Sequence, residues 1–213
     1  MKPNYAAALS FLLLLGLVYF SFYTHKPQSV SDAETPLTQF STARAMVYVD
    51  SISREAHAVG MPAHQSVQDY IVHTLEAMNL EVEIQSDFAY KPGWGALSRA
   101  ENIIARIPGT GNGQTLLLMS HYDSAPHTAS HGASDAGSGV AAILETIRAY
   151  LAKGEKATND IIILFTDAEE LGLNGASVFV NEHPWAEDVD LALNFEARGS
   201  GGPSNMIVET NGG

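Results

Sequence analysis

The chain has 213 residues, enough for one domain of ordinary size plus a short appendage. Hydrophobic residues make up 46% of it and charged residues 16%, which excludes a disordered chain and is typical of a packed domain. The net charge of −13 repels a phosphate backbone, so we expect no nucleic-acid partner. The absence of cysteine excludes a disulfide framework, a thiol nucleophile and any zinc site built on Cys, so a metal would have to be held by His, Asp and Glu.

The N-terminal segment is strongly apolar. Residues 6–23 carry no charge, and as a helix they would span about 27 Å, close to the thickness of a bilayer's hydrocarbon core. No small-residue cleavage site follows, so we expect a single transmembrane anchor over residues 1–25. A cleaved signal peptide and a buried core helix are the alternatives. With an anchor or a signal peptide, the rest of the chain lies outside the cytoplasm, in a periplasm or a lumen.

The polar, proline-bounded residues 26–37 are typical of a linker, and residues 38–213 are expected to form one domain. Four early segments have helical or strand periodicity: helices over 38–57 and 66–78, strands over 80–85 and 102–107. In the first helix, the spacing places Phe40, Ala43, Val47 and Ile52 on the buried face. The Gly-rich residues 109–115 suggest a phosphate-binding loop, but they lack the Gly-Lys-Ser/Thr ending. We interpret them as a hairpin turn between two strands.

Three later runs are almost entirely apolar: Leu116–Met119, Ile161–Phe165 and Leu191–Phe195. Such runs are typical of strands buried on both faces, as in a parallel sheet covered by helices. Helical spacing over 139–151 and 170–180 places a helix between successive strands. The sequence therefore predicts an α/β fold, a three-layer α/β/α sandwich with a mixed, mostly parallel sheet.

Each apolar run ends in potential metal ligands. The first is followed by His121 and Asp123, the second by Glu169 and Glu170, and the third by Glu196. In open α/β sheets the functional site lies beyond the carboxyl ends of the strands. One such ending could be a helix cap, but three at one edge are hard to explain by capping alone. We therefore expect a metal site at this edge.

Each candidate also has a purely structural alternative. Asp123 shares a face with His121 in extended chain and could fix its tautomer, or it could be a solvated neighbour of a surface histidine. Asp135, before a glycine-rich helix start, could bridge two cations or cap the helix. Glu169 and Glu170 could divide metal binding and proton transfer between them, or could be first-turn acids favoured by the helix dipole.

Four motifs in this order resemble a known family: His121–Ser124, Ser134–Gly139, Asp167–Gly172 and Asn194–Gly199. They resemble the co-catalytic zinc exopeptidases, family 28 of the metallopeptidases in clan MH. The resemblance is greatest to its membrane-bound branch, the endoplasmic-reticulum metallopeptidases and vacuolar membrane proteases. It extends from about residue 38 to the end of the chain.

The resemblance implies a zinc exopeptidase-like fold, two Zn²⁺ ions per complete catalytic domain, and peptide substrates. Asp135 would bridge the two ions. His121 and Glu196 would complete one site, and Glu170 would bind the other ion. The family member implied is a membrane-anchored metallopeptidase, most simply an aminopeptidase.

The resemblance also implies catalytic roles. Glu169 would be the general base that activates a water between the zinc ions, and Asp123 would orient His121. Soluble members carry Asp at the position of Glu196, whereas the membrane-bound branch commonly has Glu. A non-catalytic ectodomain of the same fold and a single-zinc glutaminyl cyclase remain alternatives.

In the family, the second zinc takes a histidine downstream of the Glu196 position. No histidine follows His183 in this sequence. The resemblance therefore implies an N-terminal fragment of a longer protein, and we expect these 213 residues alone to be inactive. The sequence does not indicate the oligomeric state.

Overall fold

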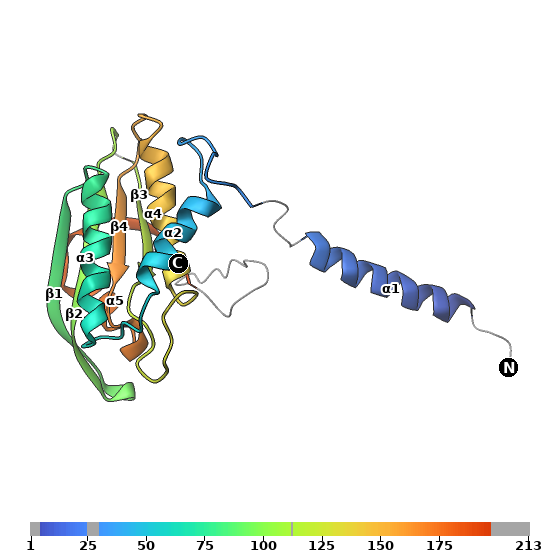
Figure 1. Cartoon of the computed structure of the whole chain (residues 1–213), viewed down its shortest axis with the longest axis horizontal. Helices are drawn as coiled ribbons and strands as arrows, with labels where there is room; N and C mark the ends of the chain where they lie inside the picture. The colour runs from blue at the N-terminus through green and yellow to red at the C-terminus, as the bar shows by residue number, and fades with distance from the viewer. Residues whose placement is uncertain (1–4, 25–29, 112, 197–213) are drawn as a thin grey trace. The chain divides into compact units, whose positions relative to one another are not determined.

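A computed structural model describes residues 5–24, 30–111 and 113–196 (Figure 1). Within these residues the chain forms a separate N-terminal helix and a compact unit that begins at Ser31. Residues 197–199 of the last motif lie outside the described residues.

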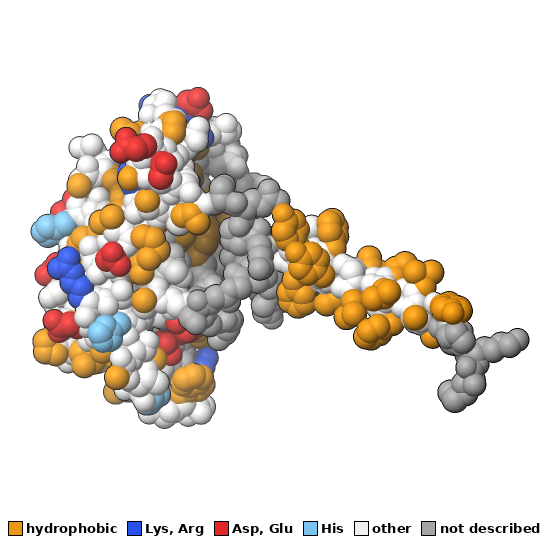
Figure 2. Space-filling model, turned by 45° about the vertical axis from the view of Figure 1, so that its right-hand side comes forward, with side chains coloured by type: hydrophobic (Ala, Val, Ile, Leu, Met, Phe, Trp, Pro, Cys, Tyr) orange, Lys and Arg blue, Asp and Glu red, His pale blue; other side chains and the backbone are white. Residues whose placement is uncertain are grey.

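The N-terminal helix α1 (Tyr5–Thr24) has 20 residues and a mean hydropathy of 2.0. None of its residues is buried, and Figure 2 shows apolar side chains along it. Among the described helices it is the one long and apolar enough to cross a bilayer. A signal sequence would have the same properties, so the anchor stays a prediction.

A five-stranded sheet forms the centre of the compact unit (Figure 1). Its strands are β1 (Val82–Lys91), β2 (Ala96–Ile107), β3 (Thr115–His121), β4 (Ile161–Thr166) and β5 (Val189–Asn194), in the order β1-β2-β4-β3-β5. β3 is parallel to both β4 and β5, whereas β2 is antiparallel to β1 and β4. The sheet is mixed, and its three mutually parallel strands are those with the apolar runs.

Helices cover both faces of the sheet. Three helices share one face: α2 (Thr42–Ile52), α3 (Pro62–Ala77) and α4 (Gly137–Leu151). Ile71 and Ile143 pack there against Ile163 of β4, and all three are fully buried. On the opposite face, Phe179 of α5 (Asn174–Glu182) packs against Ile162. Burying each such side chain contributes about 1.5–3 kcal/mol, and the predicted three-layer sandwich is confirmed.

Residues 109–115 do not form the expected hairpin turn. The two strands that they connect, β2 and β3, lie on either side of β4. The loop instead follows the chain that leads into β4, where Thr110 N donates to Ala157 O at 2.9 Å and Gly109 N donates to the Asp160 carboxylate at 2.6 Å. The reason is burial: every residue of β4 is buried, so this run takes the central position between the other two.

Two further expectations about burial are wrong. β5 is exposed rather than covered on both faces, with Leu191 at 56%. It lies at the edge of the sheet, and β3 is its strand neighbour in the described part of the chain. In α2 the buried face contains Ala45, Val49 and Ile52, whereas Val47 is 58% exposed.

Part of the expected linker belongs to the compact unit. The guanidinium of Arg44 donates to Ala33 O at 2.8 Å and to Thr35 O at 2.7 Å, and Arg148 donates to Leu37 O at 2.8 Å. Both arginines also bind the fully buried carboxylate of Glu145, Arg44 at 3.0 Å and Arg148 at 2.7 Å. Glu145 therefore joins residues 31–37 to the body of the domain.

Replacing Glu145 by Gln is expected to lower the free energy of unfolding by about 2–3 kcal/mol, because two partly buried arginines lose their counter-ion. Burial alone would raise the pKa of Glu145, but the hydrogen bonds from Arg148, Ser41 N and Arg44 outweigh it and lower the pKa. A lowered folded-state pKa stabilises the protein above the ordinary value of 4.5, and this stabilisation is lost as the pH falls through the folded-state pKa. Urea unfolding between pH 3 and 7 measures both effects.

The exposed Glu155→Gln is the matched control and should leave the unfolding curve unchanged. If the two variants unfolded alike at pH 7, Glu145 would not hold residues 31–37 in place.

Candidate metal centre

The parallel pairing of β4, β3 and β5 brings three strand ends to one edge of the sheet. His121 is the last residue of β3. Glu169 and Glu170 lie in the short helix η2 (Glu169–Leu171), which follows β4. Glu196 lies two residues after the end of β5. The structure thus places the three expected groups of ligands together.

His121 is the centre of this cluster. It is 2% exposed, at the end of β3. Nε2 lies 3.1 Å from Asp135 Oδ1, 3.4 Å from Glu196 Oε1 and 3.9 Å from Glu169 Oε2. One imidazole nitrogen therefore faces three carboxylates, two of which the resemblance assigns as ligands.

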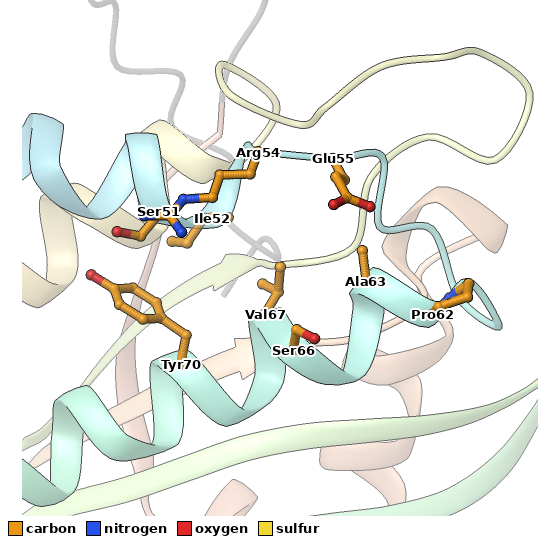
Figure 3. A pocket seen from close by; sticks show the side chains of 9 residues that line it. All are labelled: Ser51, Ile52, Arg54, Glu55, Pro62, Ala63, Ser66, Val67 and Tyr70. Carbon is orange, nitrogen blue, oxygen red and sulfur yellow. The ribbon is translucent and has the colours of Figure 1, made fainter.

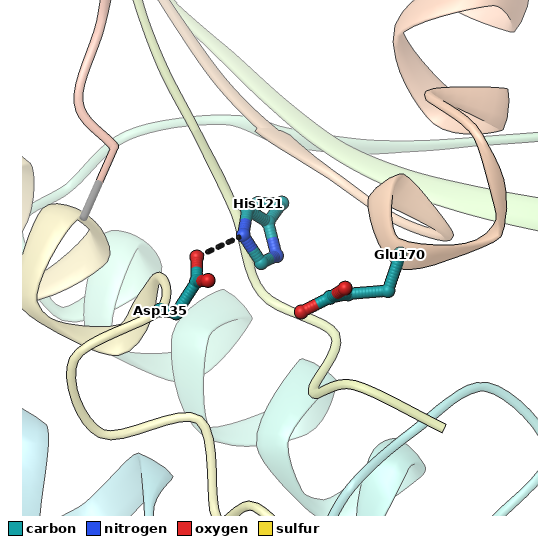
Figure 4. Close-up of side chains that lie close together, drawn as sticks. All are labelled: His121, Asp135 and Glu170. Carbon is teal, nitrogen blue, oxygen red and sulfur yellow. Dashed lines mark hydrogen bonds and ion pairs between the residues drawn. The ribbon is translucent and has the colours of Figure 1, made fainter. Parts of the chain in front are cut away.

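Glu170 completes a group of potential ligands with His121 and Asp135 (Figure 4). Each of the three residues offers one ligand atom, and these atoms lie within 4.8 Å of one another. An imidazole nitrogen with carboxylate oxygens is a donor set that suits zinc. Glu169 is not in this group, so the two adjacent glutamates are not equivalent.

The electrostatics of the cluster show an excess of negative charge. Burial raises the pKa of Asp135, and the nearby Glu196 carboxylate raises it further. Burial also raises the pKa of Glu169 and of Glu170, with further contributions from neighbouring carboxylates. A bound cation would offset the repulsion among these groups, so the residues present fit a metal ion.

His121 is held in its charged form by neighbouring carboxylates. Burial alone would lower its pKa, but Asp123 and Glu196 outweigh burial and raise the pKa to about 11. A metal binds only the neutral imidazole, so a cation must displace this proton.

Asp123 contacts both His121 and the chain after β4. The Nδ1 atom of His121 lies 2.9 Å from the main-chain carbonyl oxygen of Asp123 and 3.5 Å from its carboxylate. The carboxylate is buried and accepts hydrogen bonds from Glu169 N at 3.0 Å and Glu170 N at 3.2 Å. Asp123 therefore contacts His121 through its carbonyl oxygen and its carboxylate, and the carboxylate also holds the first residues of η2.

Asp135 does not cap the helix that follows it. The N-cap residue of α4 is Ala136, and no side chain caps this helix end. The Asp135 carboxylate instead lies beside His121, as Figure 4 shows. Its position is compatible with a bridging ligand and not with the structural alternative.

Close backbone packing positions Glu196. Phe195 N donates to Met119 O at 2.8 Å, and Ser120 Oγ donates to Phe195 O at 2.9 Å. Gly139 allows this approach, because a Cβ atom there would collide with Phe195 O and with Ser120 Oγ. The glycines of the Ser134–Gly139 motif thus have a packing role next to the candidate ligands.

Sequence reasoning missed a buried histidine close to the candidate ligands. His64 from α3 contacts both Tyr122, which follows β3, and Asp167, which follows β4. Tyr122 and Asp167 belong to two of the four sequence motifs, but the sequence assigned no role to either of them. His64 has no local spacing to the other residues, so no sequence pattern indicates it.

A separate pocket lies between α2 and α3 (Figure 3). Its volume is about 380 Å³, and Arg54, Glu55 and Tyr70 are among its lining residues. It contains none of the predicted site residues.

Comparisons with known proteins agree with this geometry. A family model described as "Peptidase family M28" matches residues 102–213, just over half of the chain. A vacuolar membrane protease of Yarrowia lipolytica is 31% identical over 218 residues, which cover 92% of this chain but 21% of the relative. The chain therefore spans about a fifth of the length of this relative.

Solved structures show the same fold. A Porphyromonas gingivalis glutaminyl cyclase matches with a TM-score of 0.62 and 28% identity, over 73% of this chain and 58% of the other. A leucine aminopeptidase precursor from Bacteroides thetaiotaomicron matches with a TM-score of 0.62 and 24% identity, over 75% of this chain and 63% of the other. The chain has a zinc exopeptidase-like fold and belongs to peptidase family M28.

Proposed function

We propose that the protein is a membrane-anchored, zinc-dependent metallopeptidase that acts as an aminopeptidase. The observation that carries this proposal is the cluster at the ends of β3, β4 and β5. There His121 Nε2 faces the carboxylates of Asp135 and Glu196, and Glu170 completes a group of potential ligands. Family membership and the name of the Yarrowia lipolytica relative support a peptidase.

Two zinc ions would be held by four side chains. His121, Asp135 and Glu196 would bind one ion, and Asp135 and Glu170 would contribute to the other. When bound, the ions would supply a Lewis acid for the scissile carbonyl and lower the pKa of water.

Glu169 would be the general base. Burial raises its pKa towards neutrality, which suits a group that must first accept and then return a proton. Its backbone N–H is held by the Asp123 carboxylate at 3.0 Å, so its position is fixed relative to His121. In the reaction Glu169 would take a proton from the attacking water and donate it to the leaving amine.

The helix α1 would anchor the catalytic domain to a membrane, with the domain on the extracytoplasmic side. Its 20 residues and lack of buried side chains support a span, and the relative named above is a vacuolar membrane protein by name. Peptides reaching that compartment would be the substrates.

A glutaminyl cyclase activity is the second candidate, because a solved structure with this name shares the fold at 28% identity. A non-catalytic ectodomain is less well supported, since a scaffold has no need of Glu169 beside Glu170 in a cluster of ligands.

Metal and product analysis of the protein purified from its membrane distinguishes these candidates. We expect about two zinc equivalents per chain, and release of free amino acids from peptides and aminoacyl anilides. A pyroglutamyl product from a peptide with N-terminal glutamine, with one zinc, would instead support the cyclase. A folded protein without metal would contradict both enzymes.

A further inference from the structure

We propose that His64 is a positioning residue that couples the two strand ends carrying the candidate metal ligands. This inference rests on the proposed metal site. His64 lies in the first turn of α3 and its residue is 8% exposed. It is not one of the grouped potential ligands in the described part of the chain, so its role would be indirect.

Through its Nε2 atom, His64 contacts the chain segment that leads into η2. Its Nε2 atom lies 2.8 Å from Oδ1 of Asp167, which is 1% exposed. The same carboxylate accepts hydrogen bonds from Ala168 N at 2.7 Å and from Glu101 N at 3.0 Å. Asp167 therefore joins α3, β2 and the end of β4 at one point.

The backbone at Ala168, directly after Asp167, needs the hydrogen bonds that Asp167 provides. Ala168 has a left-handed conformation with φ of 52°, which costs a residue with a side chain roughly 1–2 kcal/mol. Its N–H is held by Asp167, and its carbonyl accepts from Asn174 N at 3.1 Å. This turn sets the direction in which Glu169 and Glu170 leave β4.

The other side of His64 supports the end of β3. Its ring stacks on Tyr122, with ring centroids 5.1 Å apart and an interplanar angle of 26°. Tyr122 stands between His121 and Asp123 and is 1% exposed. Its hydroxyl donates to Glu101 O at 2.8 Å and accepts from Gln68 Nε2 at 3.1 Å. One imidazole thus contacts the chain segments on which both His121 and Glu170 depend.

The chemistry of the His64–Asp167 pair also indicates that it positions the nearby chain segments rather than stabilising the fold. Burial would lower the pKa of His64, but the Asp167 carboxylate outweighs it and raises the pKa, which favours a charged pair. A buried ion pair is often no more stable than apolar side chains of the same volume. Its directed hydrogen bonds, however, fix geometry in a way that apolar packing does not.

The test compares three variants of the whole protein: His64→Leu, His64→Gln and His73→Leu. The readouts are the zinc dissociation constant from chelator competition, the visible spectrum of the Co²⁺ form, and the melting temperature. We expect His64→Leu to weaken zinc binding about 10–100-fold and to shift the Co²⁺ spectrum. His64→Gln should restore most of the affinity, because its amide can donate to Asp167 from the position of Nε2.

His73→Leu is the matched control, since His73 lies on the same helix with its side chain 80% exposed, and it should leave all three readouts unchanged. A second control, Val67→Ala, removes core volume from α3 and should lower the melting temperature without changing zinc affinity.

The outcomes separate this inference from the proposed function. A wild-type protein that binds no zinc contradicts the metal site itself. A wild-type protein that binds zinc, with His64→Leu binding equally well, overturns the role of His64 alone. If His64→Leu does not fold, the test uses Asp167→Asn. This substitution keeps the shape of the side chain and removes its negative charge. An unchanged zinc affinity together with an unchanged Co²⁺ spectrum would then overturn the inference.

Discussion

Replacing Glu169 by Gln is expected to slow peptide hydrolysis by about 10²–10⁴-fold while zinc stays bound. The amide has almost the same shape as the carboxylate but cannot accept the proton of the attacking water. Glu169 lies outside the group of potential ligands in the described residues, and its Oε2 is 3.9 Å from His121 Nε2. We therefore expect kcat to fall and the zinc content, measured by elemental analysis, to be unchanged.

The neighbouring Glu170→Gln is the sharpest comparison, because both glutamates lie in η2 and have raised pKa values through burial. Glu170 is in the ligand group, so its variant should lose metal as well as activity. The exposed Glu182→Gln should behave like the wild type. Metal loss in the Glu169 variant with metal retained in the Glu170 variant would mean that the two roles are reversed.

The placement of the site could be predicted because it depends on a general property of sheets. Apolar runs indicated the parallel strands, and parallel neighbours have their carboxyl ends at the same edge. The residues directly after those runs therefore had to lie close together. His121, Glu170 and Glu196 follow this rule, and the structure brings all three to one edge.

The strand order, the exposure of β5 and the buried face of α2 could not be predicted from local patterns. Asn112 and Gly113 have the composition of a hairpin turn, but the connection passes from β2 to β3 across β4. The apolar residues of β5 match those of β4, yet β4 is flanked by two strands whereas β5 has one strand neighbour within the described residues. In α2, Val47 and Val49 have the same side chain, and packing against α4 and α3 decides which of them is buried.

The supporting contacts of the site depend on tertiary structure alone. Asp123 was expected to hold His121 through its carboxylate, because the two residues are close in sequence. The carboxylate lies 3.5 Å from His121 Nδ1 and also binds the N–H groups of Glu169 and Glu170, which come from another strand end. Contacts of this kind join residues far apart in the sequence, so neither spacing nor periodicity indicates them.

Zinc binding to the 213-residue chain is expected to be stepwise and to strengthen with pH. In the ligand assignment proposed above, His121, Asp135 and Glu196 would supply three ligands to one cation. Asp135 and Glu170 would supply two to a second cation, counting only described residues of the cluster. Because protein zinc sites normally have at least three protein ligands, we expect one tightly bound ion and a second bound much more weakly.

The pH dependence follows from the proton on His121. Its pKa is raised to about 11 in the metal-free protein, and zinc requires the neutral imidazole. Below that pKa the neutral fraction falls tenfold per pH unit, so the apparent affinity of the first ion should rise about tenfold per unit between pH 7 and 9. Towards acid the dependence should steepen, because burial also raises the pKa of Asp135 and of Glu170.

Chelator competition at pH 6, 7, 8 and 9 measures how the apparent affinity for the first ion changes with pH. His131 is exposed, so His131→Asn is the control and should show the same pH dependence as the wild type. His121→Asn should remove the slope together with most of the affinity, because it removes both the ligand and the competing proton. An affinity for the first ion that does not change between pH 7 and 9 would show that zinc does not displace a proton from His121, and the carboxylates alone would then have to hold the ion.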